Sequence, residues 1–173
     1  MDIHQTIRGR RSPTEFTARV PTRDEIERLL DAAIMAPNHK MTQPWHFYVF
    51  GDEAKQTYAE LRGELKSQKV EDPEVRRRVR EKVSGAILKV PVLLAVAARQ
   101  DEDPMTREED YAATWMGIEN LLLEAHGMGL GGYIHTGRIM DRPALREALG
   151  VPEDQRIVAL IDLGRARGAA GPA

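Results

Sequence analysis

Three arginines and a serine gather near the start of the chain. Arg8, Arg10, Arg11 and Ser12 converge where a first helix, predicted over residues 3–10, should end. Guanidinium groups bind phosphate through paired hydrogen bonds, and a neighbouring hydroxyl adds a further donor. The same arginines could instead interact with the dipole at the carboxyl end of that helix. The segment therefore predicts either a phosphate site or a capped helix end.

A second polar segment, APNHKMTQPWHF, occupies residues 36–47. Pro37 and Pro44 restrict its backbone, and the segment lies between a predicted helix and a predicted strand. The polar side chains between the prolines are Asn38, His39, Lys40, Thr42 and Gln43. Such a concentration of hydrogen-bonding groups in a constrained loop indicates that a ligand uses them.

Three glycines, Gly127, Gly129 and Gly132, form a G-x-G-x-x-G pattern. In dinucleotide-binding folds this pattern follows a strand and begins a helix, so that the phosphates meet the helix N-terminus. Here the predicted order is reversed, with a helix over 107–126 and a strand over 133–136. We interpret the glycines as a helix C-cap and a flexible turn. The alternative is a turn whose backbone approaches a flat ligand closely.

Other kinds of chemistry are disfavoured. No pair of histidines is spaced as H-x-x-x-H and the chain has no Cys, so we expect no metal site. Ser12 and Ser84 lack the glycine context of a hydrolase nucleophile. The basic run at 76–80 has no interleaved aromatic residue, which indicates an exposed helix face rather than a nucleic-acid site.

Taken together, these motifs resemble the nitroreductase family of flavin mononucleotide (FMN) enzymes. The resemblance rests on Arg10-Arg11-Ser12, on the proline-flanked segment 36–47, and on Gly129-Leu130-Gly131 after a long helix, in the family's order and approximate spacing. It extends over nearly the whole chain and is closest to a small, compact branch of NAD(P)H nitroreductases. The segment 36–47 is specific, whereas the other two motifs are weak alone.

This resemblance implies the architecture and the assembly. We expect an α+β fold with a central mixed β-sheet covered by helices. We also expect a homodimer with an intertwined interface and two FMN molecules, each touched by both chains. Residues 1–167 would form a single FMN-binding domain, and residues 168–173 a flexible tail.

The resemblance also implies which residues bind FMN. The segment after the first helix would hold the phosphate and ribityl chain, the proline-flanked loop would reach the flavin from the partner subunit, and the strand after the glycines would add contacts. In that order the residues are Arg10, Arg11 and Ser12; Pro37, Asn38 and His39; and Ile134, His135 and Thr136. Arg165 and Arg167 stand near the position where longer relatives place basic phosphate ligands.

Two positions depart from the pattern of the small branch. Ile134-His135-Thr136 replace a Trp-Arg-Ser sequence, and Met35 replaces an arginine. Each departure removes a positive charge. Lys40 is a candidate for the cation that would stabilise negative charge near N1 of the reduced flavin. No catalytic residue is predicted, because the redox chemistry belongs to the cofactor.

The activity implied is that of an FMN-dependent NAD(P)H oxidoreductase. Hydride would pass from the nicotinamide to flavin N5, and then to a nitroaromatic, quinone or similar acceptor in the same pocket, by a ping-pong scheme. Two alternatives remain. One is a specialised flavin enzyme, for example for reductive dehalogenation or oxygen-dependent chemistry, and the other is an FMN-binding or storage module.

Periodicity and turn signals predict the elements that carry these motifs. Thr22 and Glu25 form a capping box ahead of a helix that ends near Ile34. Further helices are predicted over 53–87 with a break at 72–73, over 107–126 and over 143–149, and strands over 46–50, 90–98, 133–136 and 157–163. Helices separate nearly every pair of strands, which favours a helix-covered sheet.

Composition places these elements in one soluble domain. The chain has 173 residues with 25 basic and 27 acidic side chains, and a formal charge of −2. This balance creates no long-range field that attracts nucleic acid or an anionic membrane. The N-terminus lacks the layout of a secretory signal, and the apolar run at 90–98 is about half the length that crosses a bilayer. We therefore expect a cytoplasmic protein.

Overall fold

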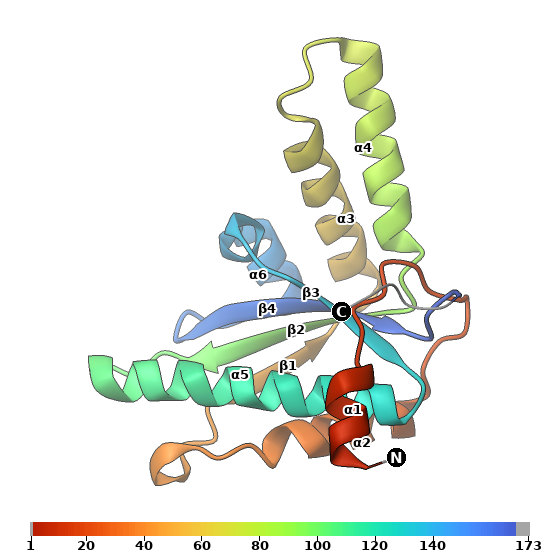
Figure 1. Ribbon diagram of the computed structural model, residues 1–173. Coiled ribbons are helices and arrows are strands. Elements are labelled where there is room, and N and C mark those ends of the chain that lie inside the picture. Colours follow the sequence, from red (N-terminus) through yellow and green to blue (C-terminus); the bar gives the residue numbers. More distant parts are fainter. Residues whose placement is uncertain (1, 169–173) are drawn as a thin grey trace.

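A four-stranded β-sheet lies at the centre of the protein, with the strand order β1-β2-β4-β3 (Figure 1). The structure is a computed structural model that describes residues 2–168. The tail predicted over 168–173 thus lies, apart from Gly168, outside the described residues. The strands are β1 (Trp45–Val49), β2 (Val92–Arg99), β3 (Gly131–His135) and β4 (Gln155–Gly164). The helices are α1 (Ile3–Gly9), α2 (Arg23–Ile34), η1 (His39–Met41), α3 (Asp52–Ser67), α4 (Pro73–Leu88), α5 (Pro104–Gly127), η2 (Arg138–Asp141) and α6 (Pro143–Leu149).

The expected α+β class is confirmed, but the expected mixed sheet is not. Within residues 2–168 all three strand pairings, β1–β2, β2–β4 and β3–β4, are antiparallel. The crossover from β2 through α5 to β3 does produce two parallel strands. They are not neighbours, however, because β4 lies between them and runs in the opposite direction to both. The parallel relation therefore never becomes a hydrogen-bonded pair.

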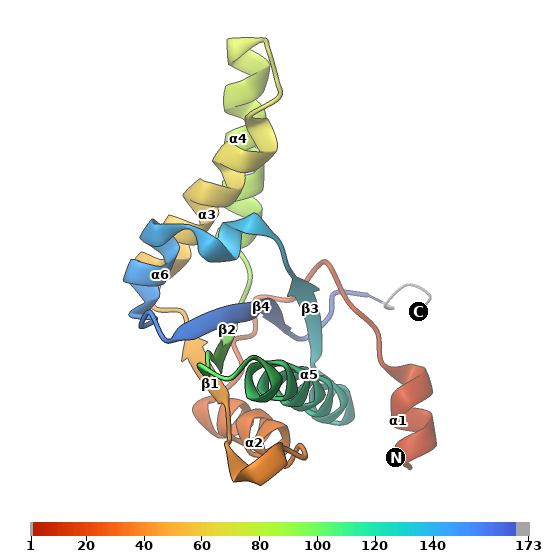
Figure 2. The same ribbon diagram turned by 90° about the vertical axis from the view of Figure 1, so that its left-hand side faces the viewer.

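Helices cover both faces of this sheet (Figure 2). On one face α2 and α5 pack on inward-facing residues of β2 and β4, such as Leu94 and Ile161. On the other face α3, α4 and α6 cover Leu93 and Leu160. Since successive side chains of a strand point to opposite faces, the central strands are apolar on both faces. This agrees with the continuous apolar character from which a buried strand was predicted at 90–98.

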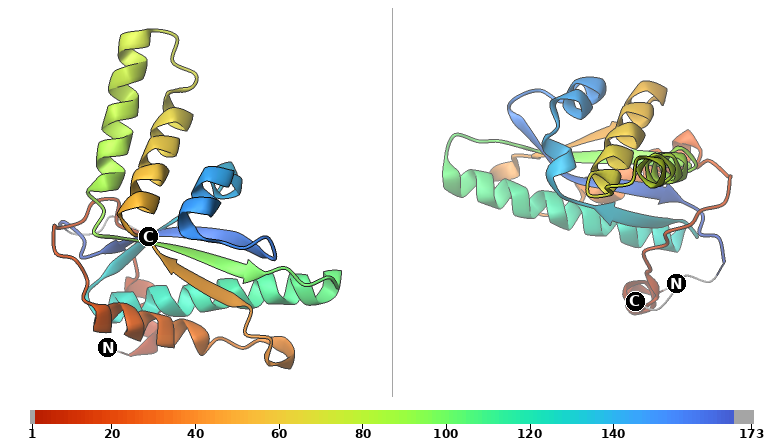
Figure 3. Two further views of the ribbon diagram at one scale, coloured as in Figure 1. Left: turned by 180° about the vertical axis from the view of Figure 1, so that it is seen from behind. Right: turned by 90° about the horizontal axis from the view of Figure 1, so that it is seen from above.

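A pair of helices, α3 and α4, projects away from the sheet as a long arm (Figure 3). The arm is the connection between β1 and β2, and its return path accounts for the antiparallel pairing of these two strands. Ion pairs Arg78–Glu74 and Arg77–Glu81 lie on the exposed surface of α4. The basic run at 76–80 is thus an exposed helix face, as predicted.

Local signals set the helix boundaries. In α2 the Thr22 hydroxyl accepts from the Glu25 backbone N–H at 3.2 Å, and the Glu25 carboxylate accepts from the Thr22 N–H at 2.8 Å. The predicted capping box is therefore confirmed. Among residues 2–168 no helix is long and apolar enough to cross a membrane. In the same range no group of three or more His, Asp or Glu side chains could hold a metal ion.

Candidate active site

The segment after α1 lies against the carboxyl end of α5 and the start of β3. Arg10 Nε lies 3.5 Å from the Glu119 carboxylate on α5. The Pro13 ring packs directly on Gly131, where an added Cβ would come within 2.6 Å of Pro13 Cγ. Gly131 therefore allows the segment to approach the sheet closely. The resemblance places the arginine-serine segment in one site with the strand that follows the glycines, and the structure brings the segment to the start of that strand.

Arg11 has the helix-capping role considered for the arginines. Its Nη1 donates to the backbone carbonyls of Arg8 at 2.7 Å and Arg10 at 2.9 Å, at the carboxyl end of α1. These bonds fix the guanidinium and use the two N–H groups on Nη1. Three further N–H donors of Arg11 are left for an anion. Nearby, Arg10 Nη1 donates to the Ser12 hydroxyl at 3.5 Å.

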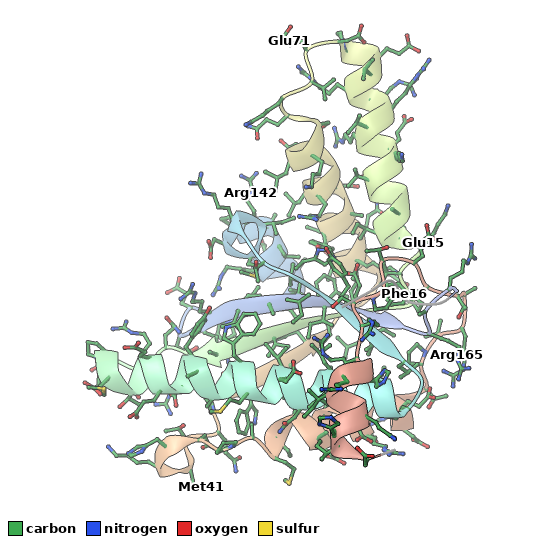
Figure 4. All side chains as sticks on the ribbon, viewed as in Figure 1. Glu15, Phe16, Met41, Glu71, Arg142 and Arg165 are labelled. Atoms are coloured by element: carbon green, nitrogen blue, oxygen red, sulfur yellow. The ribbon has the colours of Figure 1, made fainter. Side chains whose placement is uncertain are left out.

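The chain after β4 returns to this same region. Residues 165–167 run beside 15–17, with a bridge between Phe16 and Ala166 and two backbone hydrogen bonds of 2.8 and 2.9 Å. Arg165 Nη2 lies 3.9 Å from the position of a Cβ on Gly129. Arg165 thus joins the glycine turn and the segment after α1. Figure 4 shows Glu15, Phe16 and Arg165 on the side of the molecule away from Met41.

An open groove of about 870 Å³ adjoins this cluster. It lies between residues 14–20 and the foot of α4. Its cations are Lys55, Lys82, Lys89 and Arg167, its carboxylates are Glu15 and Glu81, and its apolar walls include Phe16, Val20, Leu88, Val90 and Pro91. The three groove lysines could not be identified from the sequence. Each belongs to a separate polar stretch, and no local motif links them.

Lys55 is the most constrained of the groove cations. Its Nζ donates to the Val90 carbonyl at 2.6 Å. Burial lowers the pKa of the Lys55 ammonium, while the carboxylates of Asp52 and Asp162 offset part of that change. The groove therefore holds one partly desolvated cation among solvated ones.

The end of β3 carries a buried polar pair. His135 Nε2 lies 2.9 Å from Asp162 Oδ2, with the two side chains 15% and 11% exposed. The Tyr133 ring lies beside that of His135, with their centres 4.7 Å apart. Ile134 points to the opposite face and packs on the core beneath α5. The side chains of His135 and Ile134 are therefore not on one surface, and Thr136 lies just beyond the strand.

The proline-flanked loop lies at the other end of α5. The Thr42 hydroxyl donates to the Asp110 carboxylate at 2.6 Å. Asp110 and His126, near the arginine segment, are 16 residues apart in α5, which corresponds to about 24 Å along the helix. Within one chain the structure thus places Arg10, Arg11 and Ser12 at the end of α1, and Arg165 beside the glycine turn. It keeps Pro37, Asn38, His39 and Lys40 apart from them.

The glycine turn has the geometry of a helix end. Gly127 closes α5, Gly129 has φ +72°, and the Leu130 N–H donates to the Ala125 carbonyl at 2.8 Å. The strand begins after the glycines, at Gly131. The helix–turn–strand order confirms the C-cap interpretation. It also excludes the dinucleotide-binding arrangement, in which the phosphates meet a following helix.

A sequence model of the nitroreductase family matches residues 7–165. YdjA of Escherichia coli K12 is 27% identical over 165 residues, which cover 95% of this chain and 88% of YdjA. YfhC of Bacillus subtilis 168 is 30% identical over 167 residues, covering 94% and 83%. Both relatives carry the provisional name NAD(P)H nitroreductase.

Solved structures agree with these sequence relatives. A nitroreductase-like family protein from Bacillus cereus has a TM-score of 0.83 and 30% identity, with 100% of this chain and 90% of that chain covered. A nitroreductase with bound FMN from Bacteroides fragilis has a TM-score of 0.77 and 22% identity, with 100% and 92% covered. At 22% identity, the comparison with the Bacteroides fragilis protein shows a shared fold.

Proposed function

The chain belongs to the nitroreductase family, and we propose that it is an FMN-dependent oxidoreductase that uses NADH or NADPH. Its acceptors would be nitroaromatics, quinones or similar small molecules, reduced by a ping-pong scheme. The observation that carries this proposal is the placement of Arg10, Arg11 and Ser12 at the end of α1, with Arg165 beside the glycine turn. The expected cytoplasmic location is part of the same proposal.

The donors at the end of α1 fit the phosphate of FMN. Arg11 keeps three N–H donors after fixing its own position, and Ser12 adds an exposed hydroxyl. Among residues 2–168 no carboxylate lies within ion-pair distance of Arg11 or Arg165, whereas Arg10 is shared with Glu119. Guanidinium groups without a carboxylate partner favour a doubly charged anion.

The groove fits the ring system of the flavin. Its volume of about 870 Å³ lies within the range of ligand pockets, roughly 300–1,000 Å³. Phe16, Val90 and Pro91 offer apolar surface to a flat ring. Lys55 and Lys82 offer positive charge, which would stabilise the negative charge of the reduced ring. These lysines join Lys40 as candidates for that role.

Bound FMN would supply the redox chemistry by accepting hydride from the nicotinamide and passing it to the acceptor. The residues of the chain would bind and orient FMN and shield its ring from water. The arginine segment anchors the phosphate end, and the groove walls limit water around the ring. Because the groove is open, the nicotinamide and the acceptor could use the same face in turn, as a ping-pong scheme requires.

We further propose that the active form is a homodimer. Large apolar side chains are exposed beside the proline-flanked loop and along α5: Met35 is 75% exposed, Met41 72% and Met105 67%. Methionine is enriched at the buried centre of protein interfaces. A second chain would also supply His39 and Asn38 to a site that they cannot reach within their own chain.

Absorbance spectra test the proposal directly. Purified protein is measured before and after FMN is added, and NADH or NADPH is then added without oxygen. We expect a spectrum of bound flavin that at least one nucleotide bleaches. Bound flavin that neither nucleotide reduces would favour an FMN-binding module instead. Failure to bind FMN would refute the proposed function.

A further inference from the structure

The loop between Pro37 and Pro44 has an unusual backbone. Lys40, Met41 and Gln43 have φ values of 52°, 55° and 45°. Residues other than glycine rarely adopt this left-handed region, because Cβ then crowds the following carbonyl group. Three such residues within four positions do not arise from local preference. Contacts elsewhere must hold the loop in this form.

Two side chains supply those contacts. The Asn38 side-chain oxygen accepts from the Gln43 backbone N–H at 2.9 Å, so it closes the loop across its base. The Thr42 hydroxyl donates to Asp110 Oδ1 at 2.6 Å. The first contact lies within the loop, whereas the second ties the loop to α5. Within residues 2–168, Thr42–Asp110 is therefore the side-chain hydrogen bond that ties the loop to another element of the fold.

Asp110 occupies a costly position for a carboxylate. The residue is 1% exposed, and its Oδ2 is buried without a hydrogen-bond partner in residues 2–168. One turn further along α5, Ala113 packs with Ala36 and Trp45, which flank the loop on either side. An apolar residue would fill such a place at lower cost, since burying a carboxylate forfeits its hydration. The burial of Asp110 calls for a role beyond packing.

We infer that Asp110 is a positioning residue of the flavin site, which acts through Thr42 to hold the loop 38–43 ready for the partner subunit's FMN. This inference rests on the proposed function. Because the loop is held in the free chain, its donors need not be ordered when FMN binds. Preorganisation of this kind increases affinity.

Removal of the Thr42 hydroxyl tests the inference. Thr42→Val keeps the shape of the side chain, Thr42→Ser keeps the hydroxyl, and Thr57→Val on α3 is the matched control. We expect Thr42→Val to raise the FMN dissociation constant about tenfold, the scale of one hydrogen bond to a charged group. Thr42→Ser should restore the wild-type value. Thr42→Val should also lower the thermal midpoint relative to Thr57→Val, because the buried Asp110 loses its hydrogen bond, so FMN affinity is compared well below that midpoint.

Asp110→Ala provides a second route to the same contact. If Asp110 acts through Thr42, the double variant should bind FMN no more weakly than Asp110→Ala alone. Amide hydrogen exchange at residues 39–43, measured without FMN, should accelerate in both single variants. Wild-type FMN affinity and unchanged exchange in Thr42→Val would overturn the inference. A wild-type protein that binds no FMN would instead refute the proposed function, while exchange would still report whether Asp110 holds the loop.

Discussion

Arg11 should dominate the binding of the FMN phosphate. Its guanidinium is held by carbonyls of α1 at 2.7 and 2.9 Å, so its remaining donors need little ordering when the anion arrives. The loss of a hydrogen bond between charged groups costs about 1.5–3 kcal/mol. At 1.4 kcal/mol for each factor of ten, Arg11→Ala should raise the FMN dissociation constant by about 10- to 150-fold. The FMN dissociation constant of Arg11→Lys should lie between those of wild type and Arg11→Ala, because lysine keeps the positive charge but lacks the paired N–H donors of arginine.

Quenching of FMN fluorescence on binding measures this affinity. Arg23→Ala is the control, since Arg23 is exposed on α2 and its ion pair within residues 2–168 is with Glu27. The titration is repeated at raised salt, where the difference between wild type and Arg11→Ala should shrink as the charges are screened. The thermal midpoint of Arg11→Ala is also measured without FMN. A lower midpoint would report the loss of the hydrogen bonds that cap α1, separately from the loss of the contact with FMN. If Arg11→Ala binds FMN like wild type, the phosphate does not lie at the end of α1.

Three further predictions concern assembly, packing and pH. Dimers of the Arg11→Ala variant alone, or of the His39→Ala variant alone, should bind FMN poorly. A mixed dimer with one subunit of each variant should bind FMN at one of its two sites, where the intact Arg11 of one chain meets the intact His39 of the other. If mixing restores no FMN binding, His39 belongs to the site of its own chain. Gly132→Ala brings a Cβ within 2.5 Å of Leu122 Cδ2 in the core, and should lower the unfolding free energy in urea by about 1–3 kcal/mol; an unchanged value would mean that the Leu122 side chain can move aside. Hydrogen bonds from Thr106 lower the pKa of Asp103, so its stabilisation of α5 is present at neutral pH and lost on acidification through that lowered pKa. Asp103→Ala should therefore unfold earlier in urea than wild type at neutral pH, and the difference should close as the pH falls below the lowered pKa of Asp103; a difference independent of pH would contradict this.

Local signals in the sequence were sufficient for most of the secondary structure. The capping box at Thr22 and Glu25 and the apolar run near 90–98 each depend on neighbours in the chain, and both correspond to observed elements. The order of the strands in the sheet does not follow from such local signals. Nothing in the apolar pattern of residues 155–164 states which strands they join, so the antiparallel placement of β4 between β2 and β3 could not be predicted.

In the candidate site, too, residues that are adjacent in sequence could be predicted and residues brought together by the fold could not. Arg10, Arg11 and Ser12 are adjacent in sequence and were identified by a motif. The groove was missed, because Lys55 and Lys82 look like ordinary exposed charges of polar helices. The groove forms because residues 165–167 pair with residues 15–17 and because the carboxyl end of α4 packs beside them. Long-range pairing of this kind leaves no mark in local periodicity.

The position of β4 has a consequence for the order in which the protein is made. Of the four strands, the ribosome produces β4 last, yet β4 lies between β2 and β3 and pairs with both. Until residues 155–164 emerge, the nascent chain exposes the unpaired edges of two apolar strands, which are templates for pairing with other chains. Synthesis proceeds at about 5–20 residues per second, so the roughly 20 residues between β3 and β4 extend this exposure by about 1–4 seconds. A chaperone that binds extended apolar segments should therefore act on this protein after β3 has been made and before β4 has emerged.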